Sequence, residues 1–567
     1  AFNSPFRTAI AKELLRHEAF RPTAGLFDLE YGAPSDLLVY ENGALAHTIP
    51  SRCGTRQGSL LGGFFFALVL HPILVDLSAR FPDLFVGAYL DDITLCGSPA
   101  RLAEAFAFCK ERLASINLVV NDSKCEFLPA DGGDCPIPAV RRVLRRIKVL
   151  GSYVGLTDAD ESEMLIKKVA AHMCLFRRCR LLGASPFSIL MLSMSVLPRV
   201  GSFMRTHSPE ATRAMAEAWD DEVRKCLFAL AAAEPSDDAA FVASLPLRLG
   251  GLGLCPQVLV AQHAYDASVD YALRPLNLSP LAAPPPSQKD AMDNAHRVRR
   301  DAAPEHLHRL LAENSEPGAN DWLSYDARVL SMGKRACSGA LRLRIGAVSP
   351  LLPESKRCPG CSREVPRERF EVHASGCAAL GVPVMKHNSL RDLLEQFALE
   401  AGHNIQHEPR EYQAYRCRGC GDILAPSDLR DHGCPGKPDR TGVDFRVLFP
   451  EGAAVYDVTV VQPLSQSYLA VSPSSTASAV DTKKHTIYDD QCASNNEELS
   501  VLCVRAAGGL CQNTREFLRR CAQDRCVDFP HLVFKEEVRR MSVELSVRLQ
   551  RFNGECVATA VARHRLD

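Results

Sequence analysis

The sequence lacks any run of 18 uncharged apolar residues, which is about the length that a membrane-spanning helix needs. Its longest apolar stretch, residues 60–70, is shorter than this and contains two glycines. No signal peptide opens the chain, and the first residue is not Met. These absences predict a protein that does not enter a membrane.

An excess of charge of either sign is also missing. The chain has 66 lysines and arginines against 67 aspartates and glutamates, a net charge of −1. Proteins that bind nucleic acids are often basic, so the total gives no support to that function. Local arginine clusters at residues 141–148, 177–180 and 297–300 do favour contacts with phosphates.

The 567 residues are too many for one hydrophobic core, because single cores stop growing near roughly 250–300 residues. We therefore expect three or more domains. The 22 cysteines do not have the spacing of a small secreted disulfide scaffold, and most lie in apolar surroundings. This pattern indicates reduced cysteines in a nuclear or cytosolic protein.

Two adjacent aspartates, Asp91 and Asp92, are flanked on both sides by apolar residues within segment 88–95. This pattern predicts a β-hairpin whose tight turn holds them. Adjacent carboxylates are costly unless a cation lies beside them, and two Mg²⁺ ions have that role in phosphoryl transfer. The alternative is a solvent-exposed turn. A glycine-containing phrase at residues 54–59 and an apolar helix reaching Leu74 stand before the pair, which favours catalysis.

Cysteine and histidine recur at the spacing of metal ligands in two clusters. The first consists of Cys358, Cys361, His373 and Cys377, and the second of Cys417, Cys420, His432 and Cys434. A Cys-x-x-Cys turn presents two thiolates to one ion, and two further ligands complete a tetrahedron. Each cluster therefore predicts a structural Zn²⁺ site. The final spacing of the second is short, so that Asp428 or Asp431 is an alternative ligand there.

Asp457 stands in the middle of an apolar strand predicted over residues 454–461. A carboxylate in such a place is costly unless it is paired or binds a metal. A turn at residues 450–452 folds a preceding segment back beside this strand, and Lys483 and Lys484 follow a Ser/Thr-rich stretch at 472–478. Two aspartates and a lysine can hold Mg²⁺ and activate water for phosphodiester hydrolysis. The alternative for the lysines is a solvated surface pair.

The order of the first motifs resembles that of reverse transcriptases of non-LTR retrotransposons. The resemblance makes Asp91 and Asp92 the catalytic metal ligands and Lys124 the residue that protonates the leaving pyrophosphate. It also implies residues that position the template and the nucleotide, namely Phe2, Gln57, Gly58, Ser59 and Tyr89. Residues 149–155 resemble the primer grip, and residues 245–254 the phrase that closes the thumb. A third catalytic aspartate and the fingers are expected before residue 1.

The C-terminal part resembles the restriction-like endonuclease of site-specific non-LTR elements, such as those in ribosomal DNA or trypanosomatid spliced-leader genes. The resemblance implies catalytic roles for Asp444, Asp457 and Lys484. In this family the first aspartate stands about a dozen residues before the second, which favours Asp444 over Asp439, although Asp439 follows a proline as in the family's Pro-Asp motif. Lys484 with Tyr488 resembles the family's Lys-x-x-x-Tyr phrase.

The two resemblances imply a multidomain α+β protein with a right-hand polymerase palm, an α-helical thumb, zinc knuckles and a restriction-endonuclease-like α/β core. The expected ranges are the palm at 1–156, the thumb at 157–272, a linker with helices at 273–350, a knuckle at 351–384, and the endonuclease with the second zinc cluster at 385–567.

The resemblance implies target-primed reverse transcription in the nucleus, with Mg²⁺ at both catalytic centres and structural Zn²⁺. The implied partners are the element's RNA, target DNA and deoxynucleoside triphosphates. Two alternatives stay open, namely a catalytically impaired remnant that binds nucleic acid and a mobile-intron-type reverse transcriptase.

Overall fold

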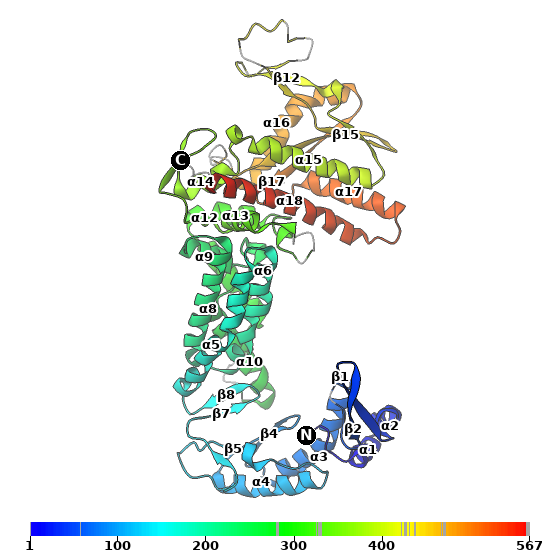
Figure 1. Cartoon of the computed structure of the whole chain (residues 1–567), viewed down its shortest axis with the longest axis vertical. Coiled ribbons are helices and arrows are strands. Elements are labelled where there is room, and N and C mark those ends of the chain that lie inside the picture. The colour runs from blue at the N-terminus through cyan, green and yellow to red at the C-terminus, as the bar shows by residue number, and fades with distance from the viewer. Residues whose placement is uncertain are drawn as a thin grey trace. The chain divides into compact units, whose positions relative to one another are not determined.

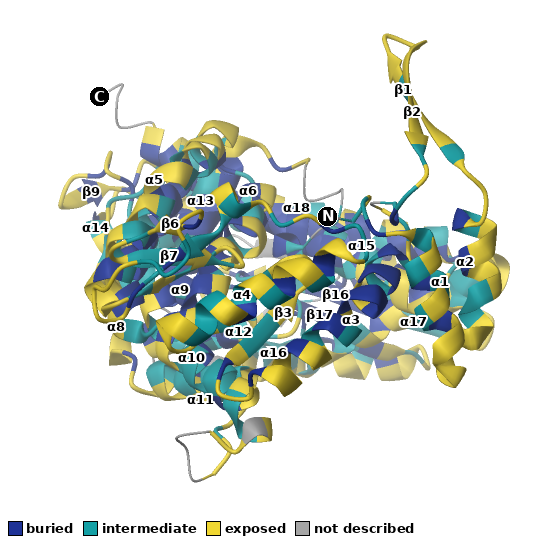
Figure 2. Cartoon of the chain, turned by 90° about the horizontal axis from the view of Figure 1, so that it is seen from below, coloured by how far each residue is buried: buried dark blue, intermediate teal, exposed yellow. Residues whose placement is uncertain are grey.

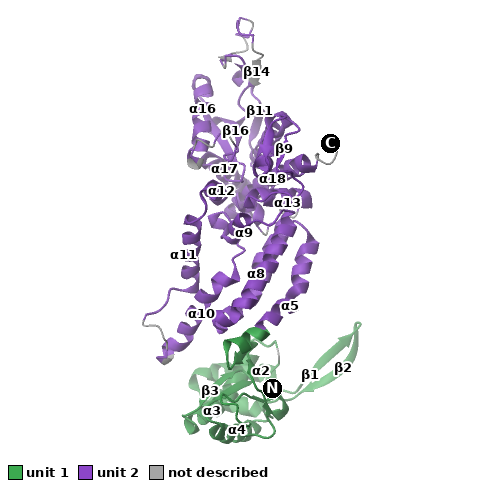
Figure 3. Ribbon diagram, turned by 90° about the vertical axis from the view of Figure 1, so that its left-hand side faces the viewer, with its two compact units in different colours: residues 1–164 green, residues 165–567 purple. Residues whose placement is uncertain are grey.

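A computed structural model describes residues 2–562 except 57, 279–282, 325, 327–330, 421, 425–427, 430, 436–437, 466–467 and 469–471. The chain divides into two compact units, unit 1 from Ala1 to Met164 and unit 2 from Leu165 to Asp567. Figure 3 shows the two in different colours. Each unit is described here by itself.

Unit 1 combines helices with short antiparallel hairpins. Its helices are α1 (Arg7–Arg16), η1 (Glu18–Thr23), α2 (Ala24–Tyr31), α3 (Gly62–Arg80), α4 (Pro99–Ala114) and η2 (Asp122–Lys124). Its strands are β1 (Ser35–Glu41), β2 (Ala44–Ser51), β3 (Phe85–Tyr89), β4 (Asp92–Cys96), β5 (Glu126–Phe127), β6 (Arg141–Arg142), β7 (Arg146–Val149) and β8 (Ser152–Gly155). Helix α1 begins at Arg7, because Phe6 still has an extended backbone.

The predicted hairpin around the two aspartates is present. Strands β3 and β4 pair antiparallel, with Tyr89 opposite Asp92, so that Leu90 and Asp91 form a two-residue turn. Leu90 has φ of 56°, a left-handed value that is costly for a bulky side chain. Its side chain packs against the core that α3 and α4 build around Phe66, and this packing offsets the cost of the turn.

A second hairpin contains residues 149–155, the segment that resembles a primer grip. Strand β7 pairs with β8 over residues 146–155, and both turn residues, Leu150 and Gly151, have positive φ. Two positive φ values in a two-residue loop suit the right-handed twist of the flanking strands. By contrast, the hairpin β1–β2 exposes almost all of its side chains, as Figure 2 shows.

Unit 2 begins with a helical region. It contains α5 (Asp158–Leu182), whose first turns belong to unit 1, then α6 (Pro186–Met191), η3 (Leu192–Val196), η4 (Leu197–Val200), α7 (Gly201–Thr206) and α8 (Pro209–Ala231). There follow α9 (Asp237–Ser244), η5 (Leu247–Leu249), α10 (Gln257–Leu273), η6 (Arg274–Leu276), α11 (Gln288–Asp301), α12 (Glu305–Ser315), η7 (Asp321–Leu323) and α13 (Lys334–Ile345). After Met191, the end of α6, the helical geometry changes first to π and then to 3-10.

Two helical stretches, Gly62–Arg80 and Pro186–Thr206, are long and apolar enough to cross a membrane by length and composition alone. In their most apolar windows 44% and 50% of the residues are buried. Core helices meet the same criterion, and Phe65 and Phe66 of the first stretch are fully buried. The two stretches are therefore weak evidence for a membrane span.

A four-stranded mixed sheet forms the C-terminal part of unit 2, in the order β11 (Asn404–His407), β15 (Phe445–Phe449), β16 (Gly452–Val461) and β17 (Glu498–Arg505). The first three strands are antiparallel, and β17 runs parallel to β16 after the crossover helix α16 (Pro473–Ser494). Helices α15 (Val382–Glu400), α17 (Gln512–Asp528) and α18 (Phe534–Ala562) share one hydrophobic core with one face of the sheet. Residues of α16 share a second core with the other face (Figure 1).

Two small β structures join this part. Strands β9 (Ser355–Arg357) and β10 (Glu364–Pro366) precede α14 (Arg367–Ala374) and η9 (Ala378–Leu380). Between β11 and β15 the chain forms η10 (Arg410–Tyr412) and a three-stranded ribbon of β13 (Ile423–Leu424), β12 (Ala414–Cys417) and β14 (Pro438–Thr441), in that spatial order.

Helix α16 begins inside the Ser/Thr-rich stretch 472–478, because residues from Pro473 on form its first turns. Proline is well tolerated at a first helical position, and this lets the helix start inside a stretch of weak helix formers. Helix α15 begins at Val382, and so it contains Lys386 and His387.

Candidate functional site

The two adjacent aspartates of unit 1 lie at the turn between β3 and β4. Asp91 is in the turn, Asp92 is the first residue of β4, and both are exposed. Tyr89, the last residue of β3, is 65% exposed. Exposed carboxylates at a fixed turn are accessible to hydrated cations and to a nucleotide.

Phe2 packs near this turn. Its ring stacks on Phe66 of α3 with centroids 4.6 Å apart, and it contacts the same core cluster as Leu90. The carbonyl of Phe2 accepts a hydrogen bond from the Thr55 amide at 2.8 Å. At Gly54 a Cβ atom would lie 2.3 Å from the carbonyl oxygen of Phe2, so that only glycine permits this approach.

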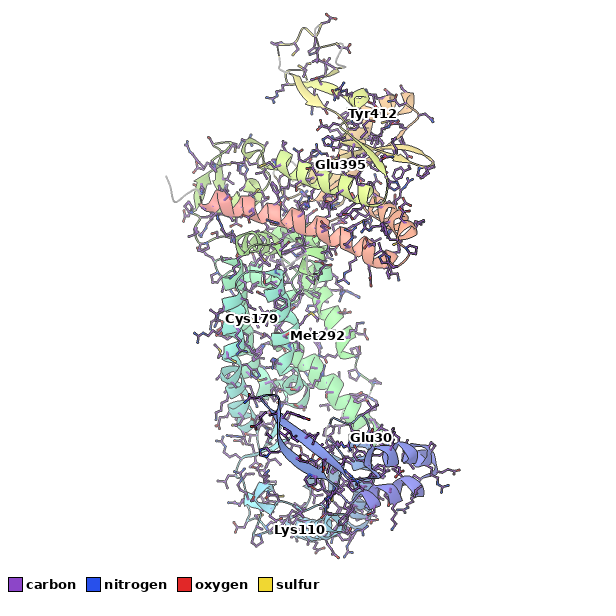
Figure 4. The ribbon with its side chains drawn as sticks, turned by 45° about the vertical axis from the view of Figure 1, so that its right-hand side comes forward. Glu30, Lys110, Cys179, Met292, Glu395 and Tyr412 are labelled. Carbon is purple, nitrogen blue, oxygen red and sulfur yellow. The ribbon has the colours of Figure 1, made fainter. Side chains whose placement is uncertain are left out.

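The remaining candidate residues of the polymerase site come from other segments of unit 1. Gly58 has φ of 91°, and Ser59 Oγ donates to a carboxylate oxygen of Glu30, labelled in Figure 4, at 2.8 Å. Gln57 lies outside the described residues. Lys124 is exposed at the end of η2.

In unit 2, Asp457 occupies the middle of β16 and is 1% exposed. Side chains alternate along a strand, so residues 456 and 458 face one side of the sheet and residues 455 and 457 the other. The former belong to the core with α15, α17 and α18, whereas Val455 belongs to the core with α16. Asp457 therefore points towards α16, away from the larger core.

Lys484 of α16 meets this carboxylate. Its Nζ donates to Asp457 Oδ1 at 2.9 Å. Tyr488, one turn further along the helix, lies on the same face, and its ring centroid is 5.8 Å from the same Nζ. Its hydroxyl is 2.7 Å from Thr441 Oγ1, at the end of β14.

Asp444, immediately before β15, is 6% exposed, and hydrogen bonds fix both its backbone and its carboxylate. Its Oδ2 accepts from the Val458 amide at 2.6 Å, and its own amide donates to the Tyr456 carbonyl at 3.0 Å. Its Oδ1 is 2.7 Å from Nε2 of His387, on α15. The structure thus brings Asp444, Asp457 and Lys484 together. Asp439 lies in β14, opposite Arg416.

His387 is the residue that the sequence did not identify. In the sequence, 57 residues separate His387 from Asp444. No local spacing connects the two, because the contact depends on how α15 packs against the sheet. A histidine that follows a lysine before an amphipathic stretch was the one available signal.

The electrostatics of this centre favour a bound cation. Burial raises the pKa of Asp457 to about 6, an effect that Lys484 opposes and the neighbouring charge of Asp444 reinforces. Burial alone would lower the pKa of His387, but its hydrogen bond to Asp444 and the charge of that carboxylate raise it. Burial also works against the charged form of Lys484, while the carboxylate of Asp457 raises its pKa. A divalent cation would stabilise both carboxylates in their ionised forms, so the donor set fits Mg²⁺.

Both cysteine–histidine clusters have converged donor atoms, all within 4.8 Å of one another in each cluster. In the first, Sγ of Cys358 and Cys377 are 3.6 Å apart, and Cys361 Sγ is 3.3 Å from His373 Nε2. Donors at tetrahedral corners around Zn²⁺ lie about 3.8 Å apart for Zn–S bonds of about 2.3 Å. The first cluster therefore fits this ion.

The second cluster fits it equally. Cys420 Sγ is 3.2 Å from His432 Nε2, and the Gly419 amide donates to Cys417 Sγ at 3.4 Å. Neighbouring amides lower the pKa of Cys417 to about 6, which favours the thiolate that binds metal. Cys434 completes the group, and neither Asp428 nor Asp431 is part of it.

Comparisons with known proteins support part of these assignments. Residues 16–154 match the protein family described as Reverse transcriptase (RNA-dependent DNA polymerase), so unit 1 holds a reverse transcriptase domain. The chain is also similar to the Retrotransposable element SLACS 132 kDa protein of Trypanosoma brucei gambiense, with 27% identity over 281 residues. This match covers 48% of the chain and 23% of that protein, so the chain spans less than a quarter of its curated relative.

Proposed function

We propose that this chain is part of a non-LTR retrotransposon protein that nicks target DNA and copies the element's RNA from the freed 3′-hydroxyl. The observation that carries the nuclease half is the convergence of Asp444, Asp457 and Lys484 at one buried centre. The polymerase half rests on the reverse transcriptase domain of unit 1. A chain with both centres has the two activities that target-primed reverse transcription requires.

In the nuclease centre, Asp444 and Asp457 would hold Mg²⁺, which lowers the pKa of bound water and stabilises the phosphorane. Lys484 has its ammonium on Asp457, so it would be placed to donate a hydrogen bond to an attacking water or to a phosphate oxygen at the same centre. His387 holds Asp444 in place through Oδ1, while the Val458 amide holds Oδ2. Two such contacts fix the rotation of the carboxylate.

In unit 1, Asp91 and Asp92 would bind the Mg²⁺ ions that align the primer hydroxyl with a deoxynucleoside triphosphate. Phe2 would lie under the sugar of this nucleotide, with Tyr89, Gly58, Ser59 and Gln57 positioning it and the template. Lys124, which is exposed, can reach the leaving pyrophosphate as a proton donor.

The same proposal includes structural Zn²⁺ at the two clusters, a nuclear location, and binding of both RNA and DNA. Zn²⁺ would cross-link short segments that bury little apolar surface, and access to chromosomal DNA requires a nuclear location. Arginines on the helices of unit 2 would contact phosphates without reading sequence.

A nicking assay tests the nuclease. The purified chain is incubated with supercoiled plasmid and Mg²⁺, and conversion to the relaxed circle is measured. Asp457→Asn keeps the size of the side chain but removes the charge that binds metal, so we expect roughly a 100-fold loss of rate, at the upper end of what loss of a metal ligand's support causes.

Asp489→Asn is the matched control, because Asp489 is an exposed carboxylate on the same helix as Lys484 and pairs only with His485 among the contacts described for its side chain. This variant should nick at the normal rate. Plasmid binding should be the same in all three proteins, since phosphate contacts come mainly from arginine and lysine. Nicking by Asp457→Asn at the wild-type rate would show that this centre is not a nuclease.

A further inference from the structure

The second cysteine–histidine cluster lies at one end of the ribbon that β12 and β14 form. The other end of this ribbon, at Ala414 and Thr441, leads into the proposed nuclease centre. Strand β12 ends at Cys417, and β14 begins opposite it at Pro438. The pairing runs from Cys417 opposite Pro438 to Ala414 opposite Thr441. Thr441 is only three residues before Asp444. The pairing register of β12 and β14 therefore determines the position of Asp444.

Helix α16 contacts both chain segments at this end of the ribbon. Tyr488 contacts Thr441 through their hydroxyls at 2.7 Å, and Gln491 Nε2 donates to the Glu411 carbonyl at 2.5 Å. Lys484 is on the same helix, one turn before Tyr488. A shift of β14 would thus be transmitted to the helix that carries the lysine.

The segment between the ribbon and the carboxylate has little freedom. A Cβ at Gly442 would lie 3.2 Å from the Tyr412 carbonyl oxygen, and Val443 is 2% exposed within the core of α16 and the sheet. Tyr412, which is labelled in Figure 4, lies two residues before β12 and is fully buried. Its hydroxyl donates to a carboxylate oxygen of Glu497 at 2.7 Å. Tightly packed segments transmit displacement because packed cores do not deform continuously.

The geometry points to a positioning role for the ribbon: Zn²⁺ at Cys417, Cys420, His432 and Cys434 locks the β12–β14 register, and through Thr441 it sets Asp444 and Lys484 for Mg²⁺. This inference rests on the proposed nuclease function. It gives the second cluster a role in the metal centre of the nuclease, besides stiffening its own segment.

Two variants test it without touching the nuclease ligands. Cys420→Ser removes a ligand on an exposed residue of the cluster, and Thr441→Val removes only the hydroxyl that contacts Tyr488. We expect both to raise the Mg²⁺ concentration for half-maximal nicking about tenfold, as loss of outer-shell support does. Thr441→Ser restores the hydroxyl and should recover the wild-type value. Cys526→Ser, outside both clusters, is the matched control.

Three readouts accompany nicking: zinc per chain, plasmid binding, and hydrogen exchange at the Val458 amide, which donates to Asp444. Cys420→Ser should lose one zinc ion and both variants should exchange this amide faster, at unchanged plasmid affinity. If Cys420→Ser loses zinc but keeps the wild-type Mg²⁺ dependence and amide protection, the ribbon does not position the centre. If the wild-type chain does not nick, the proposed function fails, and amide protection alone then decides whether the ribbon sets Asp444.

Discussion

At the scale of single residues, the support of Asp444 by His387 gives a direct prediction. Replacing His387 with Ala leaves Oδ1 of Asp444 without this donor, and the carboxylate then loses one of the two contacts that fix its rotation. We expect Mg²⁺ affinity in the nicking assay to fall about 10- to 100-fold.

His407→Ala is the control for this experiment. His407 also contacts a carboxylate, with Nδ1 at 2.7 Å from Glu395, but its side chain is half-exposed and, among the contacts described for it, it pairs only with Glu395 and Glu408. Glu395 is labelled in Figure 4. This variant should keep the wild-type Mg²⁺ dependence. An unchanged dependence in His387→Ala would mean that the histidine does not orient the metal ligand.

A buried carboxylate elsewhere in unit 2 predicts how stability depends on pH. Glu313 is 1% exposed, and burial raises its pKa to about 7, although Arg505 Nη1 donates to its Oε1 at 2.7 Å and opposes the shift. Since the folded pKa lies above the ordinary value of 4.5, its contribution is fully present below pH 4.5 and is lost as pH rises through 7.

We therefore expect the free energy of unfolding to fall between about pH 5 and 8, by at most roughly 3 kcal/mol from this group. In Glu313→Gln the amide oxygen can still accept from Arg505, but the titration is gone. Urea unfolding at about pH 5 and 8 should show a smaller difference in the free energy of unfolding for this variant than for the wild type. An equal difference in both proteins would assign the pH dependence to other groups.

At the scale of elements, a buried ion pair joins α13 to the helix of the first cluster. Arg342 Nε lies 2.8 Å from Glu371 Oε1, and each residue is 4% exposed. The same carboxylate accepts from the Ser349 amide at 3.1 Å, and the guanidinium donates to the Ala231 carbonyl. Removing one partner leaves an unpaired buried charge, which costs about 3–5 kcal/mol.

Arg342→Met and Glu371→Leu should each destabilise unit 2 by about that amount, whereas the double variant should recover much of the loss because no buried charge is left unpaired. Chemical denaturation of the four proteins measures the cycle. If the two single changes are additive in the double variant, the pair is not coupled in the way its geometry indicates.

The sequence predicted those elements whose signal is local. Apolar residues on both sides of Asp91 and Asp92 predicted the hairpin, and an aspartate within an apolar strand predicted that Asp457 needs a partner. The structure supplies Lys484 as that partner. The start of α16 escaped prediction because serines and threonines are weak helix formers, so their stretch carries little local signal for a helix. The His387–Asp444 contact and the link from Thr441 to Tyr488 join distant segments, so no spacing in the sequence reveals them.

At the scale of the whole molecule, both cysteine–histidine clusters are in unit 2, on either side of α15 in the chain. Each has four donors, and Cys358 of the first and Cys417 of the second are each 1% exposed. Tetrahedral sites with four protein ligands are structural zinc sites. We therefore expect two zinc ions per chain in protein purified under reducing conditions, measured by elemental analysis against protein concentration.

Single cysteine substitutions distinguish the two zinc sites. Cys361→Ser and Cys420→Ser should each leave one zinc ion, and the double variant none, because the clusters share no ligand. Cys174→Ser, an exposed cysteine on α5, should leave two. Removal of zinc by a chelator, followed by return to Mg²⁺ alone, should lower the unfolding midpoint of unit 2, since zinc binding contributes directly to the folding of such segments. Zinc contents of zero in the wild type would contradict both sites. A content of one that Cys420→Ser does not reduce would remove the second site and, with it, the zinc-dependent positioning of Asp444.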